Sequence, residues 1–353
     1  MAQIDSKWAY PDPATLRAQA VWEVLIEAHR QLAELKGLCD SLPNGGLLID
    51  TLAIQEAKDS SEIENIITTH DELYQGSESG SAAAKEVRHY VAALRVGFDA
   101  VRAEKMIRLS TLLAVQAEIE QNRAGLRTLP GTVLKNQAGD TVYEPPQHPE
   151  EVARLMADLI DFIHADDGLD ALLRMAIVHH QFESIHPFYD GNGRTGRILN
   201  LLLLQREGLL ELPVLYLSRY ITSTKAEYYR LLQETRKSGD WVSWCVYLVK
   251  GVAVTAKHEI RLIKSLQILM QDTAERMRRE LPKLYSQELL NNLFRYPYTK
   301  IEFVERDLQV SRITAAKHLD ALAEKSFVRK QKIGRSNFYI NQPLFDLLSN
   351  MTL

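Results

Sequence analysis

A short glycine-containing loop joins two long apolar segments, and this arrangement limits the folds open to the chain. Residues 169–185 are rich in Leu, Ile, Met and Ala without Pro or Gly, and residues 194–207 have a similar composition until Gly208. Segments of this length and composition form largely buried helices. Gly191 and Gly193 let the connecting backbone turn so that its N–H groups converge at the start of the second helix. The sequence therefore predicts a helical core with an anion-binding loop at one helix start.

The loop itself, residues 186–197, reads HPFYDGNGRTGR and carries side chains suited to phosphate chemistry. His186 titrates near neutral pH and can take a proton from an attacking hydroxyl. Asp190 offers the hard oxygen ligand with which proteins hold Mg²⁺ beside substrate phosphates. Asn192 can donate to a phosphate oxygen where charge develops. These residue types favour a site that transfers a phosphate-containing group.

Two arginines follow in the first turn of the second helix. Arg194 and Arg197 are three residues apart, so their guanidinium groups can bind neighbouring phosphate oxygens. Each feature of the loop also has an ordinary explanation: His-Pro can end a helix, Asp-Gly can form a turn, and arginines on a helix are often solvated. Their occurrence within twelve consecutive residues favours the functional interpretation.

The loop matches, without a departure, the Fic-family signature HxFx(D/E)GNGRxxR, and the chain resembles Fic proteins. The preceding HHQFE and the later LSRY and EYY are similar to the family as well. The resemblance implies a protein adenylyltransferase, which moves AMP from Mg-ATP to a Ser, Thr or Tyr hydroxyl of a target protein, or of itself, and releases pyrophosphate. The related Doc branch, which phosphorylates, lacks the GNGR core that is intact here.

The resemblance also implies roles for individual residues. His186 is expected to be the catalytic residue, and Mg²⁺ is the expected cofactor, with Asp190 as its protein ligand. Tyr228 would border the adenine, although a tyrosine of the hydrophobic core is almost as good an interpretation. The expected ATP-binding residues are Asp190, Gly191, Asn192, Gly193, Arg194, Thr195, Gly196, Arg197 and Tyr228.

An upstream segment fits the inhibitory pattern of the family. Residues 60–65, SSEIEN, match (S/T)xxxE(G/N), with Ser60, Glu64 and Asn65 in the defining places. In a helix, Ser60 and Glu64 share a face. The resemblance implies that Glu64 pairs with Arg197, the arginine that should receive the γ-phosphate, so that the enzyme is self-inhibited. The alternative is an ordinary amphipathic helix with a surface glutamate.

Two β-rich runs flank a polar, glycine-containing connection and predict a β-hairpin. They are residues 132–135 and 141–144. The resemblance identifies the hairpin as the flap, whose exposed edge pairs with an extended segment of the target protein. A surface hairpin without a role in binding is the alternative. The expected target-binding residues are Thr132, Val133, Leu134, Val142 and Tyr143.

The predicted fold is mostly α: a Fic-type helical core with one β-hairpin flap, followed by a small α+β winged-helix domain. Residues 310–319 resemble a recognition helix, and residues 330–336 would form its wing. The predicted regions are an N-terminal helical region with the inhibitory helix (1–108), the Fic catalytic core (109–254), a linker helix (255–282) and the winged helix-turn-helix domain (283–353).

Basic residues on the C-terminal domain lie where DNA phosphates could be bound: Arg312, Lys317, Arg329, Lys330, Lys332 and Arg335. Winged helices also dock proteins or dimerise, and the sequence leaves both uses open. The whole chain could accordingly be a DNA-binding regulator whose Fic core senses nucleotide, but a sensor has no evident need for His186. An enzyme that removes AMP from a modified protein is a third interpretation.

Composition restricts the remaining partners. A net charge of -4 argues against a chain committed as a whole to nucleic acid. Cys39 and Cys245 are the only cysteines, which excludes a disulfide scaffold and favours a reducing compartment. The sequence shows neither a signal peptide nor a membrane-length apolar segment, so a cytoplasmic protein without a membrane partner is expected. The expected partners are ATP and a target protein, and the resemblance allows a homodimer.

Overall fold

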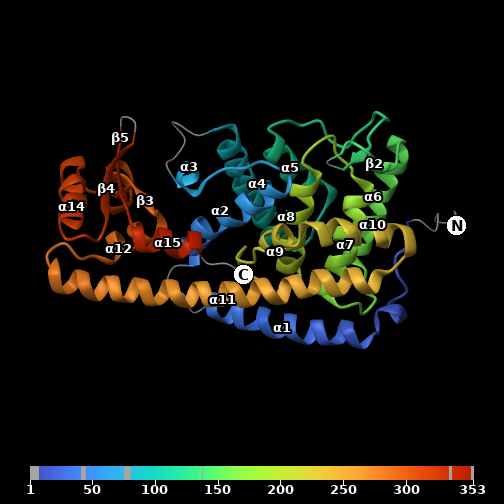
Figure 1. The fold of residues 1–353 in the computed structure, drawn as a ribbon, viewed down its shortest axis with the longest axis horizontal. Helices are drawn as coiled ribbons and strands as arrows, with labels where there is room; N and C mark the ends of the chain where they lie inside the picture. Colours follow the sequence, from blue (N-terminus) through green and yellow to red (C-terminus); the bar gives the residue numbers. More distant parts are fainter. Residues whose placement is uncertain (1–7, 41–44, 75–80, 137, 334–335, 351–353) are drawn as a thin grey trace.

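A computed structural model describes residues 8–40, 45–74, 81–136, 138–333 and 336–350 of this protein (Figure 1). Helices dominate, and the few strands form two small antiparallel sheets. This confirms the predicted mostly α fold. None of the helices in the described ranges is both long and apolar enough to cross a membrane.

The N-terminal and central helices surround the predicted catalytic loop, residues 186–197. They are the 3-10 helix η2 (Pro13–Leu16) and α1 (Gln19–Asp40), α2 (Gly45–Ile63), α3 (His70–Tyr74), α4 (Ala82–Glu104), α5 (Leu109–Glu120), α6 (Pro149–His164), α7 (Ala171–Ile185), α8 (Asn192–Arg206), α9 (Leu217–Ser223) and α10 (Lys225–Ser238). The hairpin β1 (Leu134–Lys135) and β2 (Thr141–Tyr143) lies between α5 and α6.

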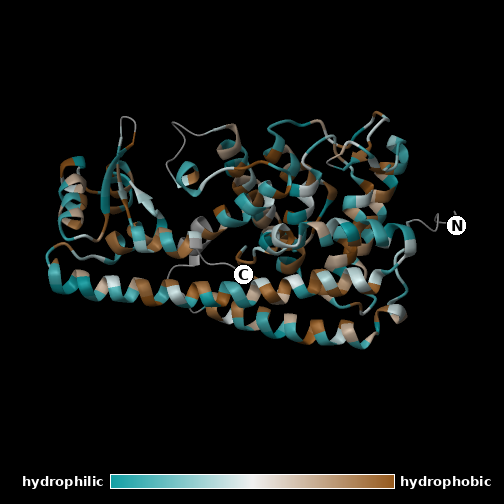
Figure 2. Ribbon diagram, viewed as in Figure 1, coloured by the Kyte–Doolittle hydropathy of each residue, from teal (hydrophilic) through white to brown (hydrophobic). Residues whose placement is uncertain are grey.

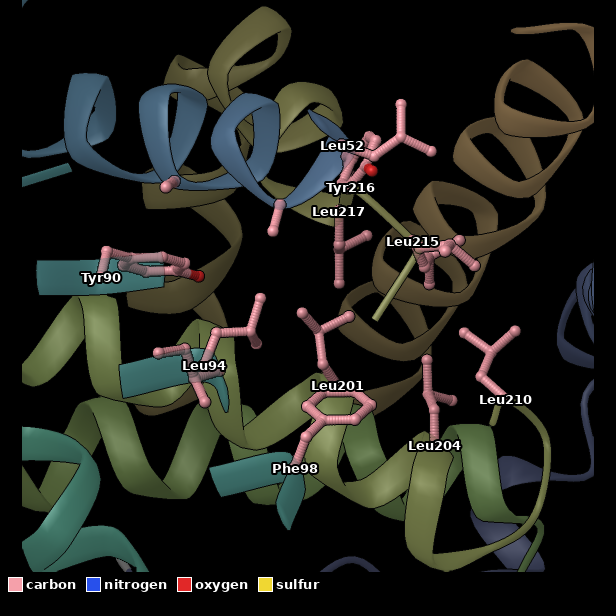
Figure 3. Packing of buried hydrophobic residues seen from close by; sticks show 14 of the residues in the cluster. Leu52, Tyr90, Leu94, Phe98, Leu201, Leu204, Leu210, Leu215, Tyr216 and Leu217 are labelled. Atoms are coloured by element: carbon pink, nitrogen blue, oxygen red, sulfur yellow. The ribbon is translucent and has the colours of Figure 1, made fainter. Parts of the chain in front are cut away.

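Helices α7 and α8 form the centre of the molecule, as their composition predicts. The Asp170 side chain caps α7 by accepting from the Leu172 N–H at 2.9 Å, and every residue from Leu172 to the end of that helix is buried. Apolar side chains of α8 pack against α4, where Phe98 lies beside Leu201 (Figure 3). Two buried helices consequently hold the loop between them from both ends.

A single long helix, α11 (Trp241–Glu280), runs along one side of the molecule with α1 packed against it (Figure 1). Apolar residues recur along both helices (Figure 2), and the buried ones include Leu32 and Leu35 of α1 and Ile260 and Ile263 of α11. The predicted boundary between core and linker, at 254/255, therefore falls inside one continuous helix, much of which belongs to the core.

Beyond α11 the chain forms a small unit of α12 (Gln287–Arg295), β3 (Tyr298–Thr299), α13 (Ile301–Leu308), α14 (Arg312–Glu324), β4 (Arg329–Ile333), β5 (Ser336–Ile340) and α15 (Gln342–Asn350). Its antiparallel sheet has the order β3-β5-β4. The expected recognition helix corresponds to α14, capped by Ser311, and the tip of the expected wing, including Arg335, lies outside the described residues.

The C-terminal unit packs back onto the region that carries the expected inhibitory helix. The Tyr298 hydroxyl donates to the Asp71 carboxylate. The Tyr298 ring stacks on Tyr74, with ring centroids 6.1 Å apart, and Phe345 lies edge-on to both. Helix α12 also contacts α2. The two ends of the chain are thus joined through α2 and α3.

Candidate active site

The predicted catalytic histidine ends α7 in a left-handed conformation. His186 has φ 49°, and its N–H donates to the Phe182 carbonyl at 2.9 Å. The Arg127 Nε donates to the His186 carbonyl at 2.8 Å, and its Nη2 donates to the Ile185 carbonyl at 3.2 Å. Arg127 is almost fully buried. It therefore fixes the turn that presents His186, a role that no sequence motif indicated.

The His186 ring is neutral at physiological pH. Burial, together with the nearby positive charges of Arg236 and Arg127, lowers its pKa to about 4, against smaller opposing effects of Glu64 and the Glu183 backbone. The buried Nδ1 atom has no hydrogen-bond partner among the described residues. The ring is thus unprotonated in the form that a general base requires.

The loop is closed by its own asparagine. Asn192 Oδ1 accepts from the Phe188 N–H at 2.8 Å, and its Nδ2 donates to the Phe188 carbonyl at 2.9 Å. The oxygen and the nitrogen of this amide therefore both bond to the Phe188 backbone. To donate to a phosphate as predicted, Nδ2 would have to bond to the phosphate and to Phe188 at the same time. Asp190 is exposed, and its Oδ1 accepts from the Gly191 N–H at 2.8 Å.

Two carboxylates hold Arg194 at the start of α8. Its Nη1 donates to Glu86 at 2.8 Å and its Nη2 to Glu120 at 2.7 Å. Gly191, with φ 76°, passes so close that an added Cβ would lie 2.7 Å from a Glu120 oxygen. Thr195 is buried, and its hydroxyl has no partner in the part of the chain that the structure describes. The start of α8 is thus tightly packed.

Arg197 lies against the expected inhibitory segment, as predicted. Its Nε donates to the Ser60 hydroxyl at 2.7 Å, and its Nη2 donates to the Ser60 carbonyl at 3.0 Å and to Glu64 Oε1 at 2.9 Å. Arg197 is buried, whereas the Glu64 side chain is 37% exposed. Burial by itself would raise the pKa of Glu64, but the Arg197 charge outweighs it and the pKa is lowered. The pair is therefore ionised.

The Glu64 carboxylate reaches onto the loop itself. A Cβ built on Gly193 would lie 2.2 Å from Glu64 Oε1 and 2.9 Å from Arg197 Nη1. Glu64 follows the last residue of α2, and Asn65 then takes a left-handed conformation with φ 63°. The Asn65 side chain accepts from Lys225 Nζ at 3.3 Å. Ser60 and Glu64 of the expected inhibitory pattern consequently contact Arg197 at the loop, whereas Asn65 contacts α10.

Buried polar contacts hold α2 in this position. Glu56 accepts from the Ser218 N–H and from the Tyr90 hydroxyl, both at 3.1 Å, and Asp59 accepts from Arg219 Nε at 2.9 Å. Burial raises the pKa of Glu56 to about 7. These contacts join α2 to α9 and α4, and no pattern in the sequence singled out Glu56 or Asp59.

The expected adenine-binding tyrosine lies in the aromatic core. Tyr228 is buried, its hydroxyl lies 2.9 Å from His179 Nε2, and Trp244 packs nearby. The neighbouring Tyr229 is 43% exposed. The structure thus supports the core interpretation of Tyr228 geometrically, and its contact with adenine stays a prediction.

A second acidic residue, Glu183, lies directly beneath α8. An added Cβ on Gly196 would lie 2.6 Å from Glu183 Oε1, an atom without a hydrogen-bond partner within the described ranges. Burial raises the Glu183 pKa to about 7, against the opposing charge of Arg197. Glu183 belongs to the HHQFE segment that resembles the family. Its position on an apolar helix did not indicate that its pKa would be near neutral.

The predicted flap is a hairpin shorter than expected. Leu134 pairs with Tyr143, whereas Thr132 and Val133 precede β1. Val142 and Val133 are 39% and 38% exposed. Apolar side chains on a short, exposed strand pair suit a surface that another strand can cover.

The flap begins directly beside the catalytic loop. The Tyr189 hydroxyl accepts from the Thr128 N–H at 2.9 Å and from the Leu129 N–H at 3.2 Å. The Arg236 guanidinium stacks over the Tyr143 ring at 4.0 Å. The hairpin is therefore attached to the loop at its entry and to α10 at its exit.

Comparison with known proteins agrees with these features. The model described as Fic/DOC family N-terminal matches residues 22–99, and that described as protein adenylyltransferase SoFic-like, C-terminal domain, matches residues 269–344. The crystal structure of a Fic family protein from Desulfovibrio desulfuricans G20 aligns with a TM-score of 0.62 and 20% identity, over 94% of this chain and 98% of that one. The chain is thus similar to Fic proteins in both matched segments and in its fold.

Curated relatives of the chain are named for one activity. Protein adenylyltransferase fic-1 of Caenorhabditis elegans is 33% identical over 34% of the chain and 23% of the relative. The probable protein adenylyltransferase aq_aa38 of Aquifex aeolicus is 35% identical over 24% of the chain and 26% of the relative. The chain thus spans about a quarter of the length of these curated relatives. A structure of Caenorhabditis elegans Fic-1 aligns with a TM-score of 0.53 and 22% identity, over 69% of this chain and 74% of that one.

Proposed function

We propose that this protein is a self-inhibited protein adenylyltransferase that transfers AMP from Mg-ATP to Ser, Thr or Tyr hydroxyls of a target protein and of itself. The observation that carries the proposal is the neutral His186 beside a glycine-lined helix start, with an exposed hairpin at the loop's edge. The names of the relatives support the same chemistry. The target protein and a cytoplasmic location are proposals from the same reasoning.

In the proposed reaction, the hydroxyl oxygen of the target attacks the α-phosphorus of ATP. A phosphorus–oxygen bond forms, the bond to the leaving pyrophosphate breaks, and His186 accepts the hydroxyl proton. The backbone at Gly191 and Gly193, at the positive end of α8, binds the phosphates. Arg194 and Arg197 would bind outer phosphate oxygens, Arg197 after release from Glu64.

Asp190 would hold Mg²⁺. Its exposed carboxylate at the loop fits a metal that takes one or two protein carboxylates and completes its shell with phosphates and water. No cluster of three or more candidate metal ligands occurs in the described part of the chain, so Asp190 would act with the nucleotide. When bound, Mg²⁺ supplies charge neutralisation to the phosphates.

The position of Glu64 supports the proposed self-inhibition. Its carboxylate occupies Arg197 and lies over Gly193, both of which the phosphates of ATP would need. The Glu64 carboxylate and an ATP phosphate are both anions, so they would repel each other if both lay at the Arg197 guanidinium and at Gly193. We propose that a productive ATP complex requires Glu64 to leave.

For the C-terminal unit we propose a winged helix that regulates the core through a protein contact. The order of its helices and strands supports the winged helix. Two of the expected DNA-binding cations are already paired within the unit: Arg312 with Glu302 at 3.1 Å and Lys330 with Asp320 at 2.7 Å. Self-association into a homodimer is one form that the protein contact could take.

Labelled ATP tests the proposal directly. The wild-type protein and His186→Ala are incubated with Mg²⁺ and ATP labelled on the α-phosphate, and transfer is measured by autoradiography and by the mass of the intact protein. We expect label on the wild-type protein or a partner and none with His186→Ala. Label that appears equally with both proteins would contradict the role of His186, and nucleotide binding without any transfer would favour a sensor.

A further inference from the structure

A polar pocket of about 400 Å³ lies between the flap, the end of α7 and the end of α10. The pocket reaches the flap at the last residue of β2. Its lining includes Tyr143, His180, Ser184, Arg236, Lys237 and Ser238. Hydroxyl, imidazole and cationic groups thus surround the space, and none of its lining residues is acidic.

Arg236 gives this pocket a positive charge that no ion pair within the described residues neutralises. Its Nε donates to the Ser184 hydroxyl at 2.8 Å and its Nη2 to the Glu183 carbonyl at 3.1 Å. Among the described residues it forms no ion pair. Burial lowers its pKa, although the guanidinium stays charged. A partly buried cation held only by neutral acceptors is less stable than one paired with an anion.

Glu183 is near enough to interact electrostatically with Arg236, but burial raises its pKa to about 7, so it is only partly charged at neutral pH. Two other carboxylates of this region are engaged elsewhere. Asp240 caps α11, where it accepts from the Ser243 N–H at 3.1 Å and from the Ser243 hydroxyl at 2.6 Å. Glu234 pairs with Arg230 on the surface of α10. Lys237 adds a second cation at the rim of the pocket. The pocket therefore attracts an anion that comes from outside the chain.

The pocket is close to the proposed reaction centre. Ser184 precedes His186 by two residues, and Arg236 is near enough to lower the pKa of the His186 ring. Tyr143 belongs both to the flap and to the pocket lining. A strand that lies along the flap with its hydroxyl at His186 would bring a neighbouring side chain to Arg236, because alternate side chains of a strand point to one side about 7 Å apart.

We propose that this pocket binds the carboxylate of an Asp or Glu side chain within a few residues of the modified hydroxyl, so that the enzyme selects acidic target segments. The carboxylate would accept from Arg236 and approach Lys237, and the serine hydroxyls would complete its hydrogen bonds. This inference rests on the proposed adenylyltransferase function, and it adds a preference that strand pairing alone does not supply.

A peptide library tests the preference. Peptides carry one central Tyr, Thr or Ser, and each flanking position is set in turn to Glu, Gln or Lys. AMP transfer is measured with the wild-type protein and with Glu64→Gly. We expect one flanking position at which Glu exceeds Gln by about tenfold or more, the range for a charge-assisted hydrogen bond, and at which Lys is disfavoured. Equal transfer to the Glu and Gln peptides would overturn the proposal.

Variants then locate the preference. Lys237→Glu reverses the charge at the rim and should reduce or invert the preference for Glu, whereas Lys250→Glu, an equal change at an exposed position on α11, should leave it unchanged. Arg236→Gln should abolish it. A preference that survives both pocket variants would place the anion site elsewhere and refute the assignment.

Binding separates the two proposals if the peptides are not modified. Fluorescence anisotropy with labelled Glu and Gln peptides is measured on His186→Ala, which retains the pocket. Tighter binding of the Glu peptide, lost with Lys237→Glu, supports the pocket even where no AMP transfer occurs, an outcome that counts against the proposed function alone. Equal binding of both peptides overturns the pocket.

Discussion

Replacing Glu64 by glycine should activate the enzyme by an amount that the structure allows us to estimate. The substitution removes one charge-assisted hydrogen bond, 2.9 Å long, between Glu64 Oε1 and Arg197 Nη2. Such a bond contributes about 1.5–3 kcal/mol. Because more than a third of the Glu64 side chain is exposed, solvent screening reduces this to roughly 1–2 kcal/mol. The population with Arg197 free should accordingly rise about 5- to 30-fold.

The assay measures the initial rate of self-modification with α-labelled ATP, at saturating ATP and with binding confirmed separately. Glu64→Gln should activate partially, since a neutral amide still binds Arg197 but more weakly than a carboxylate does. Glu62→Gly is the matched control. It places glycine near the same end of α2, but Glu62 pairs with Lys58 at 3.2 Å and not with the loop. It should therefore cost helix stability without activating.

The double variant tests whether the two residues act through one contact. Arg197→Ala should abolish most transfer, and adding Glu64→Gly to it should give no further activation, because residues that act through a shared contact are not additive. Equal rates for the wild-type protein and Glu64→Gly, in protein shown to bind ATP, would refute the inhibitory role while leaving the catalytic loop in place. Activation by Glu62→Gly would refute the specific contact.

Three further outcomes are expected. His186→Ala should lower transfer at least about 100-fold while ATP affinity is retained. As the pH is lowered, the wild-type rate should fall only near pH 4, because the His186 ring has a pKa of about 4 and stays neutral above it. A decline centred near pH 6.5 would contradict this. Glu183→Gln should leave the free energy of unfolding unchanged near pH 4 and increase it by up to roughly 3 kcal/mol at pH 8, as measured by urea unfolding. The reason is that the carboxyl ionises near pH 4.5 in the unfolded chain but only near pH 7 in the folded protein. An equal difference between wild type and variant at both pH values would count against a raised pKa. Removing residues 282–353 should preserve self-modification and increase it, because Tyr74 and Asp71 next to the inhibitory segment lose their contacts with Tyr298; lower activity in a folded protein would show that the C-terminal unit supports the active arrangement.

The sequence was most informative where local chemistry and helix periodicity coincide. The loop between two apolar segments predicted the ends of α7 and α8 within two residues, and the hairpin was predicted from its turn. The contact between Glu64 and Arg197, 133 residues apart in the chain, was implied only by the family pattern and is present in the structure. Periodicity alone could not have placed α2 at the loop.

The supporting residues were not predictable in the same way. Arg127 and Arg236 come from segments with no motif, and each acts by donating to backbone carbonyls of residues 183–186. Such contacts depend on how α7, α10 and the flap approach one another, which is a tertiary property. The resemblance predicts that Tyr228 borders the adenine, and this stays a prediction, because the structure shows only that its hydroxyl lies 2.9 Å from His179 Nε2 in the core.

In the proposed mechanism, glycine at position 193 lets one loop bind both the nucleotide and the inhibitory carboxylate. A side chain there would collide with Glu64 Oε1, 2.2 Å from the Cβ position, and with Arg197 Nη1. The same open backbone at a helix start attracts phosphate. A carboxylate is an anion too, so a site built for phosphate also attracts Glu64, which is already attached to the chain. The proposed inhibition needs no additional binding site, so the loss of one side chain should be enough to weaken it.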